Sequence, residues 1–141
     1  RVAVTGLTNP SISEPHAKTQ VYEWDAGEQQ WAPVGQSVIS TFSPEISPPR
    51  LSQDGTLLVV GDYEYAAPTN PLAGRVRVFK DVDGVWVNAF SIEGTEPLAS
   101  FGGRFGIDVD ISADGSVFGF SSPFSDEFGT EAGFVKIYAA P

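Results

Sequence analysis

LSQDGTLLVVGD, residues 51–62, and ISADGSVFGFSS, residues 111–122, are two copies of one pattern in a chain of 141 residues. Their Asp-Gly pairs, Asp54-Gly55 and Asp114-Gly115, lie 60 residues apart. In each copy, apolar residues flank an Asp-Gly pair that suits a β-hairpin turn, in which the Gly would take a positive φ and the Asp side chain would bond the local backbone. Self-similarity at a period of 55–60 residues is typical of repeat architectures, and it predicts the blades of a β-propeller.

A second pattern recurs in step with the first. It alternates small or β-branched residues with one aromatic residue, as a half-buried strand does. Its aromatic residues Tyr22, Phe79 and Tyr138 are spaced by 57 and 59 residues. The pattern occurs as TQVYEW at 19–24, VRVFKD at 76–81 and VKIYAA at 135–140. The repeat therefore continues through the whole chain.

The first copy lacks its front end. RVAVTG at 1–6 overlays on TLLVVG at 56–61 with a shift of 55, which places an Asp-Gly turn just upstream of Arg1. Trp31 and Trp86 recur at equivalent places in the strand that follows the Val-x-aromatic block. We expect both tryptophans to pack between neighbouring blades.

The repeats predict an all-β domain of ten short strands, in groups of three, four and three. The groups lie in residues 1–40, 41–94 and 95–141, as three blades of which the first and last are incomplete. Hairpin turns are expected at 25–27 and 83–84, and Pro33 suits an edge strand. With 15 Gly and 11 Pro in the chain, no long segment has a convincing helical stripe.

A run of three blades ends in two broad apolar faces, which soluble monomers rarely expose. We therefore expect these blades to be part of a larger propeller. Either the remaining blades of the same polypeptide or identical copies of the chain would close the ring.

Composition limits the partners. The 41% of hydrophobic residues can fill a core, whereas 18 acidic against 8 basic residues give a net charge of −10. This charge repels phosphate backbones and anionic lipids, so nucleic acid is not an expected partner. No apolar run approaches the roughly 20 residues that a membrane span needs, so no membrane insertion is expected. The acidity suits a saline or extracellular setting, and secretion or the cell surface is the expected location.

The stretch at 105–138, FGIDVDISADGSVFGFSSPFSDEFGTEAGFVKIY, resembles the FG-GAP repeat of integrin-α-type propellers. The similarity lies in the Phe-Gly opening, the Asp-Gly turn, the Pro-bearing loop and the final Val-x-Ile-Tyr strand. In the second copy, Ile46 stands where Gly106 does, and Pro48-Pro49 stand where Asp108-Val109 do. The resemblance implies a propeller, usually of seven blades, that binds macromolecules.

Calcium-binding members of that family carry alternating Asp or Asn oxygens in this turn, since calcium takes six to eight hard ligands. Here SQDG and SADG each offer one carboxylate, Asp54 or Asp114. A plain turn is therefore the expectation, and no cofactor is predicted. Asp108 and Asp110 are the only, and weak, candidates for a cation site.

Asp108 and Asp110 share one face of a strand that would line the central channel, where a neighbouring blade would bury them. A buried, unpaired carboxylate is costly. The sequence leaves three solutions open: an ion pair with Arg104, exposure to water, or a bound cation or ligand.

The long loops between the second and third strands of each repeat would lie side by side at one rim, where binding residues often gather. Two of them carry aromatic and acidic residues that suit a protein or a glycan. These residues are Tyr63, Tyr65, Phe124, Asp126, Glu127 and Phe128. The alternative is that these side chains fold the loops back onto the strands.

No catalytic residues are predicted, and an enzyme is less expected than a binder. The leading hypothesis is a noncatalytic binding, adhesion or assembly module that presents variable loops to a macromolecular partner. One alternative is a carbohydrate-active propeller enzyme that uses channel-mouth carboxylates such as Asp108 and Asp110. Another is a scaffold subunit of a larger complex.

Overall fold

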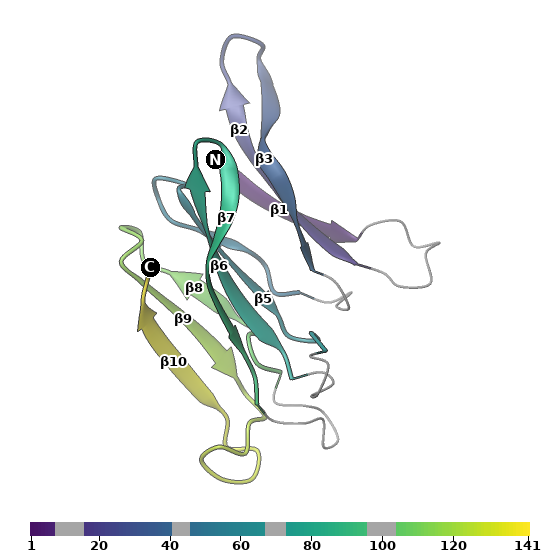
Figure 1. The fold of residues 1–141 in the computed structure, drawn as a ribbon, viewed down its shortest axis with the longest axis vertical. Coiled ribbons are helices and arrows are strands. Elements are labelled where there is room, and N and C mark those ends of the chain that lie inside the picture. Colours follow the sequence, from purple (N-terminus) through teal and green to yellow (C-terminus); the bar gives the residue numbers. More distant parts are fainter. Residues whose placement is uncertain (8–15, 41–45, 67–72, 96–103) are drawn as a thin grey trace.

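The computed structural model describes residues 1–7, 16–40, 46–66, 73–95 and 104–141, and every regular element in them is a β-strand (Figure 1). The strands form three antiparallel sheets, which we call the first, second and third sheet in chain order. The strands are β1 (Val2–Leu7), β2 (Ala17–Asp25), β3 (Gln30–Ser40), β4 (Arg50–Leu51), β5 (Leu57–Asp62), β6 (Arg75–Val82), β7 (Val85–Glu93), β8 (Val109–Ile111), β9 (Val117–Ser122) and β10 (Phe134–Ala139).

The strand groups agree with the repeats. The sheets have the orders β1-β2-β3, β4-β5-β6-β7 and β10-β9-β8, so the prediction of three, four and three strands is confirmed. Each sheet takes its strands from one of the three predicted ranges. The sheets lie side by side, with the second between the other two (Figure 1).

The two Asp-Gly turns have the same hydrogen bonds. The Ser52 hydroxyl donates to Asp54 Oδ1 at 2.6 Å, and the Ser112 hydroxyl donates to Asp114 Oδ1 at 2.7 Å. The φ values of Gly55 and Gly115 are 69° and 71°, a region that favours glycine. The predicted hairpins are therefore confirmed, and a serine hydroxyl stabilises each of them.

The hairpins between the Val-x-aromatic strand and the strand after it are confirmed as well. Asp25 Oδ1 accepts the Gly27 amide at 2.8 Å in the first sheet. In the second sheet, Asp83 and Gly84 both have positive φ, 52° and 80°, as a two-residue type I′ turn requires. Pro33 lies on β3, which pairs only with β2 and is thus an edge strand.

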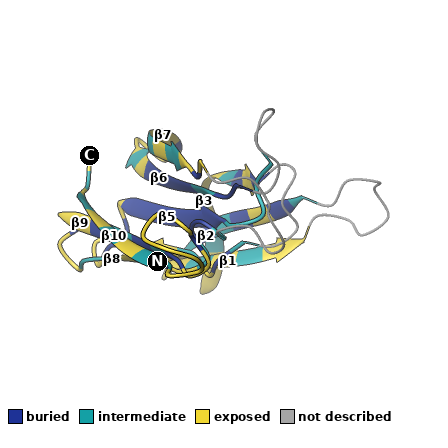
Figure 2. Cartoon of the chain, turned by 90° about the horizontal axis from the view of Figure 1, so that it is seen from below, coloured by how far each residue is buried: buried dark blue, intermediate teal, exposed yellow. Residues whose placement is uncertain are grey.

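Two apolar clusters hold the sheets together. We call the face of each sheet that points in the direction from the first sheet to the third its rear, and the opposite face its front. The middle strands of the second sheet are buried on both faces: β5 along its whole length and β6 from Val76 to Phe79 (Figure 2). The cluster between the first and second sheets contains Val21, Val38, Leu58, Val60, Phe79 and Trp86. The cluster between the second and third sheets contains Leu57, Val59, Val76, Val78, Phe105, Val109, Phe118 and Phe120.

The register corrects the overlay of the first strand. Val2 lies opposite Tyr22, as Leu58 lies opposite Phe79 and Phe118 opposite Tyr138. The structural shift between β1 and β5 is therefore 56, and the shift of 55 predicted from RVAVTG was wrong by one residue. Since successive side chains point to opposite faces, a shift of 55 would place every residue of β1 on the wrong face.

A second correction concerns the Phe-Gly opening. The Gly106 amide donates to the Ser121 carbonyl at 2.9 Å, and the Ser47 amide donates to the Gly61 carbonyl at 2.8 Å. Ser47 therefore matches Gly106, and Ile46 matches Phe105. Both Ile46 and Phe105 pack in the apolar clusters between sheets. The match of Ile46 with Gly106 was wrong because the second copy has one residue fewer before β4.

Candidate functional site

The described ends of the rim loops share one hydrogen-bonded frame. In the β5–β6 loop, the Tyr65 amide donates to the Asp62 carbonyl at 3.0 Å, and the Gly74 amide donates to the Tyr65 carbonyl at 3.1 Å. In the β9–β10 loop, the Ser125 amide donates to the Ser122 carbonyl, and the Gly133 amide donates to the Ser125 carbonyl. Loops with almost no residues in common therefore leave and return to their sheets in the same way.

Tyr65 is anchored to a buried charge cluster. Its ring lies 3.7 Å from the Arg75 guanidinium carbon, in a cation–π contact. Arg75 Nη2 and Arg77 Nη2 each lie 2.9 Å from Asp62 Oδ2, and Asp62 is fully buried. The Ser40 hydroxyl donates to the other oxygen of Asp62. Tyr65 and Tyr63 are both half-buried.

The charge cluster joins the first and second sheets. Arg77 donates to the Ser40 hydroxyl at 2.8 Å and to the Ile39 carbonyl at 3.3 Å, and both acceptors lie on β3. Burial lowers the pKa of the Arg77 guanidinium, and the Asp62 carboxylate opposes that shift. The sequence analysis missed this cluster, although Arg75 and Arg77 in a strand otherwise rich in valine were a signal for a buried partner.

The β9–β10 loop is more exposed. Phe124 is 41% exposed and has the Arg104 guanidinium 5.7 Å from its ring, and Phe128 is 70% exposed. Asp126 Oδ1 accepts the Glu131 amide at 2.7 Å, within the same loop. Glu127 forms an ion pair of 2.6 Å with Lys136 on β10. The acids thus hold the loop in shape, whereas the two phenylalanines are exposed.

A cavity of about 110 Å³ opens between the second and third sheets at the rim. Among the predicted rim residues, all of which are described, only Glu127 lines it. Tyr63 and Tyr65 belong to one loop and Phe124 and Phe128 to the next, and no described pocket brings them together. The candidate rim residues therefore form two separate groups, one on each loop.

Asp108 and Asp110 are exposed in the described chain, in which no further blade lies beside this face. Asp110 Oδ1 lies 3.7 Å from Arg50 Nε of the second sheet. Arg104, the partner considered from the sequence, lies over Phe124 instead. Exposure is therefore the outcome for both carboxylates.

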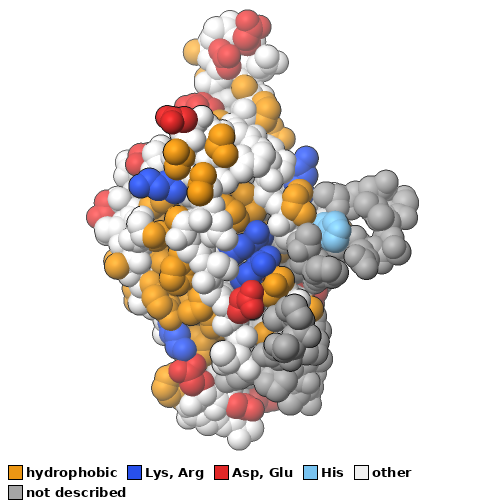
Figure 3. Space-filling model, in the orientation of Figure 1, with side chains coloured by type: hydrophobic (Ala, Val, Ile, Leu, Met, Phe, Trp, Pro, Cys, Tyr) orange, Lys and Arg blue, Asp and Glu red, His pale blue; other side chains and the backbone are white. Residues whose placement is uncertain are grey.

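A trough of about 410 Å³ runs along the rear of the third sheet, where no described strand covers it. Both carboxylates, Asp108 and Asp110, line it. Gly119 forms part of its floor, beside exposed apolar side chains of β9 and β10. These side chains are Val117, Val135 and Ile137, which are 41%, 71% and 72% exposed. Figure 3 shows hydrophobic side chains gathered on the visible side of the molecule, where β7, β9 and β10 lie.

The front of the first sheet is the second exposed apolar face. Val2 and Val4 on β1 are 40% and 54% exposed. Trp24 and Trp31 form an edge-to-face pair with ring centroids 5.6 Å apart, and they are 47% and 50% exposed. Trp31 thus departs from the expected packing between blades, whereas Trp86 meets it with 3% exposure against the first sheet.

Sequence reasoning predicted two apolar end faces but did not name the residues that form them, and it placed its candidate site residues in the loops and at Asp108 and Asp110. Comparison of equivalent positions in the repeats could have identified these residues. Val117, Val135 and Ile137 occupy the positions of Leu57, Val76 and Val78, which are at most 8% exposed. The same residue positions are therefore buried in the middle repeat and exposed in the last one.

No group of three or more His, Cys, Asp or Glu side chains suited to a metal ion occurs in the described ranges. The two turn carboxylates are engaged by their own turns. Hydrogen bonds from the Ser112 hydroxyl and from Ser116 lower the pKa of Asp114 to about 2, and those from Ser52 and Thr56 lower the pKa of Asp54. The described part of the chain also contains no helix long and apolar enough to cross a membrane.

No protein-family model matches the chain, and no curated protein is significantly similar to it. The fold class and the two candidate surfaces therefore stand on the sequence and the geometry alone.

Proposed function

We propose that the chain is a noncatalytic binding and assembly module built of propeller-type blades. In this proposal its apolar end faces join further blades, and its rim loops contact a protein or a glycan. The three sheets would be one complete and two incomplete blades of FG-GAP-like repeats. A secreted or surface-exposed protein is the setting that suits a net charge of −10.

One observation carries the proposal. On the rear of the third sheet, Val135 and Ile137 are 71% and 72% exposed, whereas Val76 and Val78 at the same positions of the second sheet are fully buried. A soluble protein rarely keeps a contiguous apolar face uncovered without an interaction to cover it. The face is thus suited to docking, and no enzyme is needed to explain it.

The Phe-Gly opening supports the blade interpretation. Phe105 is 7% exposed and packs against Phe120, with ring centroids 4.5 Å apart, between the second and third sheets. Gly106 has a φ of 84°, and a Cβ there would lie 2.6 Å from Val76 Cγ2. The Phe fills the space between two sheets, and the Gly lets the backbone approach the preceding one. A motif with these two roles would recur wherever one blade packs on another.

The rim gives the module its second surface. Phe124 and Phe128 are exposed on a loop whose acids, Asp126 and Glu127, are held by the loop and by Lys136. Exposed rings on a fixed loop lose little conformational entropy on binding, and they can stack on a sugar or pack on a protein. The rim aromatics are therefore the proposed contact for a partner.

The experiment is a binding screen of the purified chain against a glycan array and a panel of basic and neutral proteins. The variant Phe128→Ala should lose at least tenfold in affinity for the partner found. Val85→Ala is the matched control, because Val85 is 51% exposed at the hairpin on the opposite end of the second sheet. Equal binding by wild type, Phe128→Ala and Tyr63→Ala would refute the role of the rim.

A further inference from the structure

The two interfaces between the sheets pair the same two kinds of face in the same order. Each stacks a mainly aliphatic rear face on a front face that carries most of the large side chains, although the rear of the second sheet also includes Phe90 of β7. The first interface places Ala3, Val21, Val34 and Val38 against Leu58, Val60, Phe79 and Trp86. The second places Leu57, Val59, Val76 and Val78 against Phe118, Phe120, Phe134 and Tyr138.

The two uncovered faces, the rear of the third sheet and the front of the first sheet, could form one more interface of this kind. The rear of the third sheet is aliphatic, with Val117, Val135 and Ile137. The front of the first sheet carries three aromatic residues, Tyr22, Trp24 and Trp31, beside Val2 and Val4. The rear of the third sheet is therefore complementary to the front of the first sheet, in the same way as the faces that pair inside the molecule.

The register extends this match to individual positions. Val117 and Ile137 take the places of Leu57 and Val78 on the rear. On the front, Val2 and Tyr22 take the places of Phe118 and Tyr138, since each pair lies directly opposite across its sheet. Stacking the third sheet on a first sheet in this register would lay β9 over β1 and β10 over β2.

We propose that the occupant of each face is a second copy of this chain. The rear of the third sheet of one copy stacks on the front of the first sheet of the next, in a head-to-tail contact. A head-to-tail contact that closes forms a ring. Two copies would place six sheets in that ring, within the four to eight that closed propellers have. The inference rests on the assembly role proposed above and adds the identity of the partner.

Gly119 allows the close approach that this stacking needs. It lies between Val117 and Ser121 on the rear of β9, opposite Ile137. Without a side chain at this position the trough stays open to large front-face residues such as Tyr22 and Trp24. In the second sheet the same position is Val59, which is fully buried in the cluster that also contains Val109 and Phe120 of the third sheet.

The test is the molar mass of the 141-residue chain by light scattering during size exclusion, for wild type and for one variant of each face. Wild type should have twice the 15.0 kDa mass of one chain. Ile137→Asp on the rear and Val4→Asp on the front should each be monomeric, because each places a charge within the contact. Val85→Asp, at an equally exposed apolar site on a hairpin tip, should remain at the wild-type mass.

Mixing the two monomeric variants tests the head-to-tail geometry. Each variant keeps one intact face, so an equimolar mixture should form a one-to-one dimer, whereas neither variant dimerises alone. A contact of one face with itself would be broken in only one of the two variants, so the other variant would dimerise alone. Circular dichroism and thermal unfolding of each variant show whether it is folded.

A folded wild-type chain that stays monomeric at every concentration would overturn the inference, as would a mixture that does not complement. Open-ended polymers would overturn the closed ring of two copies. The proposed binding function is judged separately, because the rim contact of Phe128 with a glycan or protein does not require self-association. A monomer that still binds its partner through the rim would therefore refute the second copy alone.

Discussion

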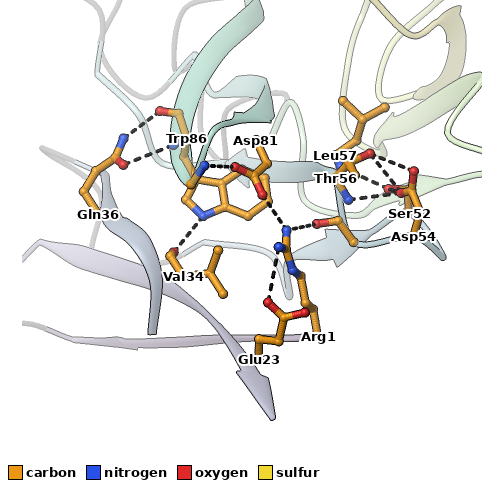
Figure 4. Close-up of polar contacts among 12 residues, drawn as sticks. Arg1, Glu23, Val34, Gln36, Ser52, Asp54, Thr56, Leu57, Asp81 and Trp86 are labelled. Carbon is orange, nitrogen blue, oxygen red and sulfur yellow. Dashed lines mark hydrogen bonds and ion pairs between the residues drawn. The ribbon is translucent and has the colours of Figure 1, made fainter. Parts of the chain in front are cut away.

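The indole nitrogen of Trp86 donates a hydrogen bond of 3.0 Å to the Val34 carbonyl oxygen, and this bond joins the second sheet to the first (Figure 4). The Gln36 side chain completes the contact by bonding both the amide and the carbonyl of Trp86, at 3.1 and 2.6 Å. The tryptophan is 3% exposed. Its counterpart in the first repeat, Trp31, is 50% exposed on the front of the first sheet.

Replacing the buried indole tests this contact. Trp86→Phe keeps an aromatic ring but removes the N–H donor, so it should lower the free energy of unfolding by about 1–3 kcal/mol. Trp31→Phe should change it by less than about 0.5 kcal/mol in the monomeric chain. Urea unfolding followed by circular dichroism gives both values. Equal losses for the two variants would contradict the contact.

Alanine substitutions at two glycines distinguish the cost of backbone strain from the cost of steric overlap. Gly106 and Gly84 have similar φ values, 84° and 80°, but only at Gly106 would a Cβ meet another atom, Val76 Cγ2 at 2.6 Å. Both Ala variants carry the strain of a positive φ, about 1 kcal/mol. Gly106→Ala should cost roughly 1–3 kcal/mol more, because the added methyl overpacks the interface. Similar unfolding midpoints for the two variants would show that the sheets do not approach closely there.

The Asp62 carboxylate forms ion pairs with two guanidinium groups, the buried Arg77 and the partly buried Arg75. Asp62→Asn leaves Arg75 and Arg77 without their counter-charge and should cost about 3–5 kcal/mol of unfolding free energy. Asp110→Asn breaks an exposed pair with Arg50 and should cost less than about 1 kcal/mol. Chemical denaturation of both variants at pH 7 measures the difference. A neutral effect of Asp62→Asn would rule out the cluster as a link between the sheets.

The Asp-Gly turns make the free energy of unfolding depend on pH in the acid range. The pKa of Asp114 is about 2 in the folded chain, below its ordinary value of 3.8. Because the folded value is the lower one, the turn's contribution is present above about pH 4 and is lost as the pH falls through about 2. The pKa of Asp54 is lowered in the same direction by the matching turn.

The double variant Asp54→Asn/Asp114→Asn should flatten the fall in unfolding free energy between pH 4 and pH 2, since asparagine keeps the acceptor oxygen but does not titrate. Asp108→Asn, which removes an exposed carboxylate outside the turns, should leave that fall unchanged. Thermal unfolding across this pH range provides the readout. The prediction fails when the control flattens the curve as much as the double variant does.

The repeat pattern predicted the strands, their grouping and their turns because local chemistry decides these features. Gly and Asp at a hairpin act within a few residues, as Asp114 and Gly115 show. The registers of Val2 and Ile46 were each wrong by one residue, because insertions between anchors leave the shift ambiguous. Gly6 matched Gly61 by residue type, whereas pairing across the sheet decides the true position.

The site was predicted less well, since it depends on which faces are covered. Asp108 and Asp110 were expected to be buried beside a further blade, and they are exposed on the rear of the third sheet. Val135 and Ile137 were identified only as strand residues. Their significance comes from comparing their exposure with that of Val76 and Val78, a comparison that needs coordinates. The rim residues, by contrast, stay predictions that only a binding experiment tests.

The absence of cysteine allows one decisive measurement on the rear face, because a single introduced thiol is the only one in the chain. In Ile137→Cys, the rate of thiol modification should fall as protein concentration rises and should return to the value of a free thiol on dilution. The rate for Val85→Cys should not depend on concentration. A rate for Ile137→Cys that stays fast and constant at all concentrations would contradict docking of this face on another copy.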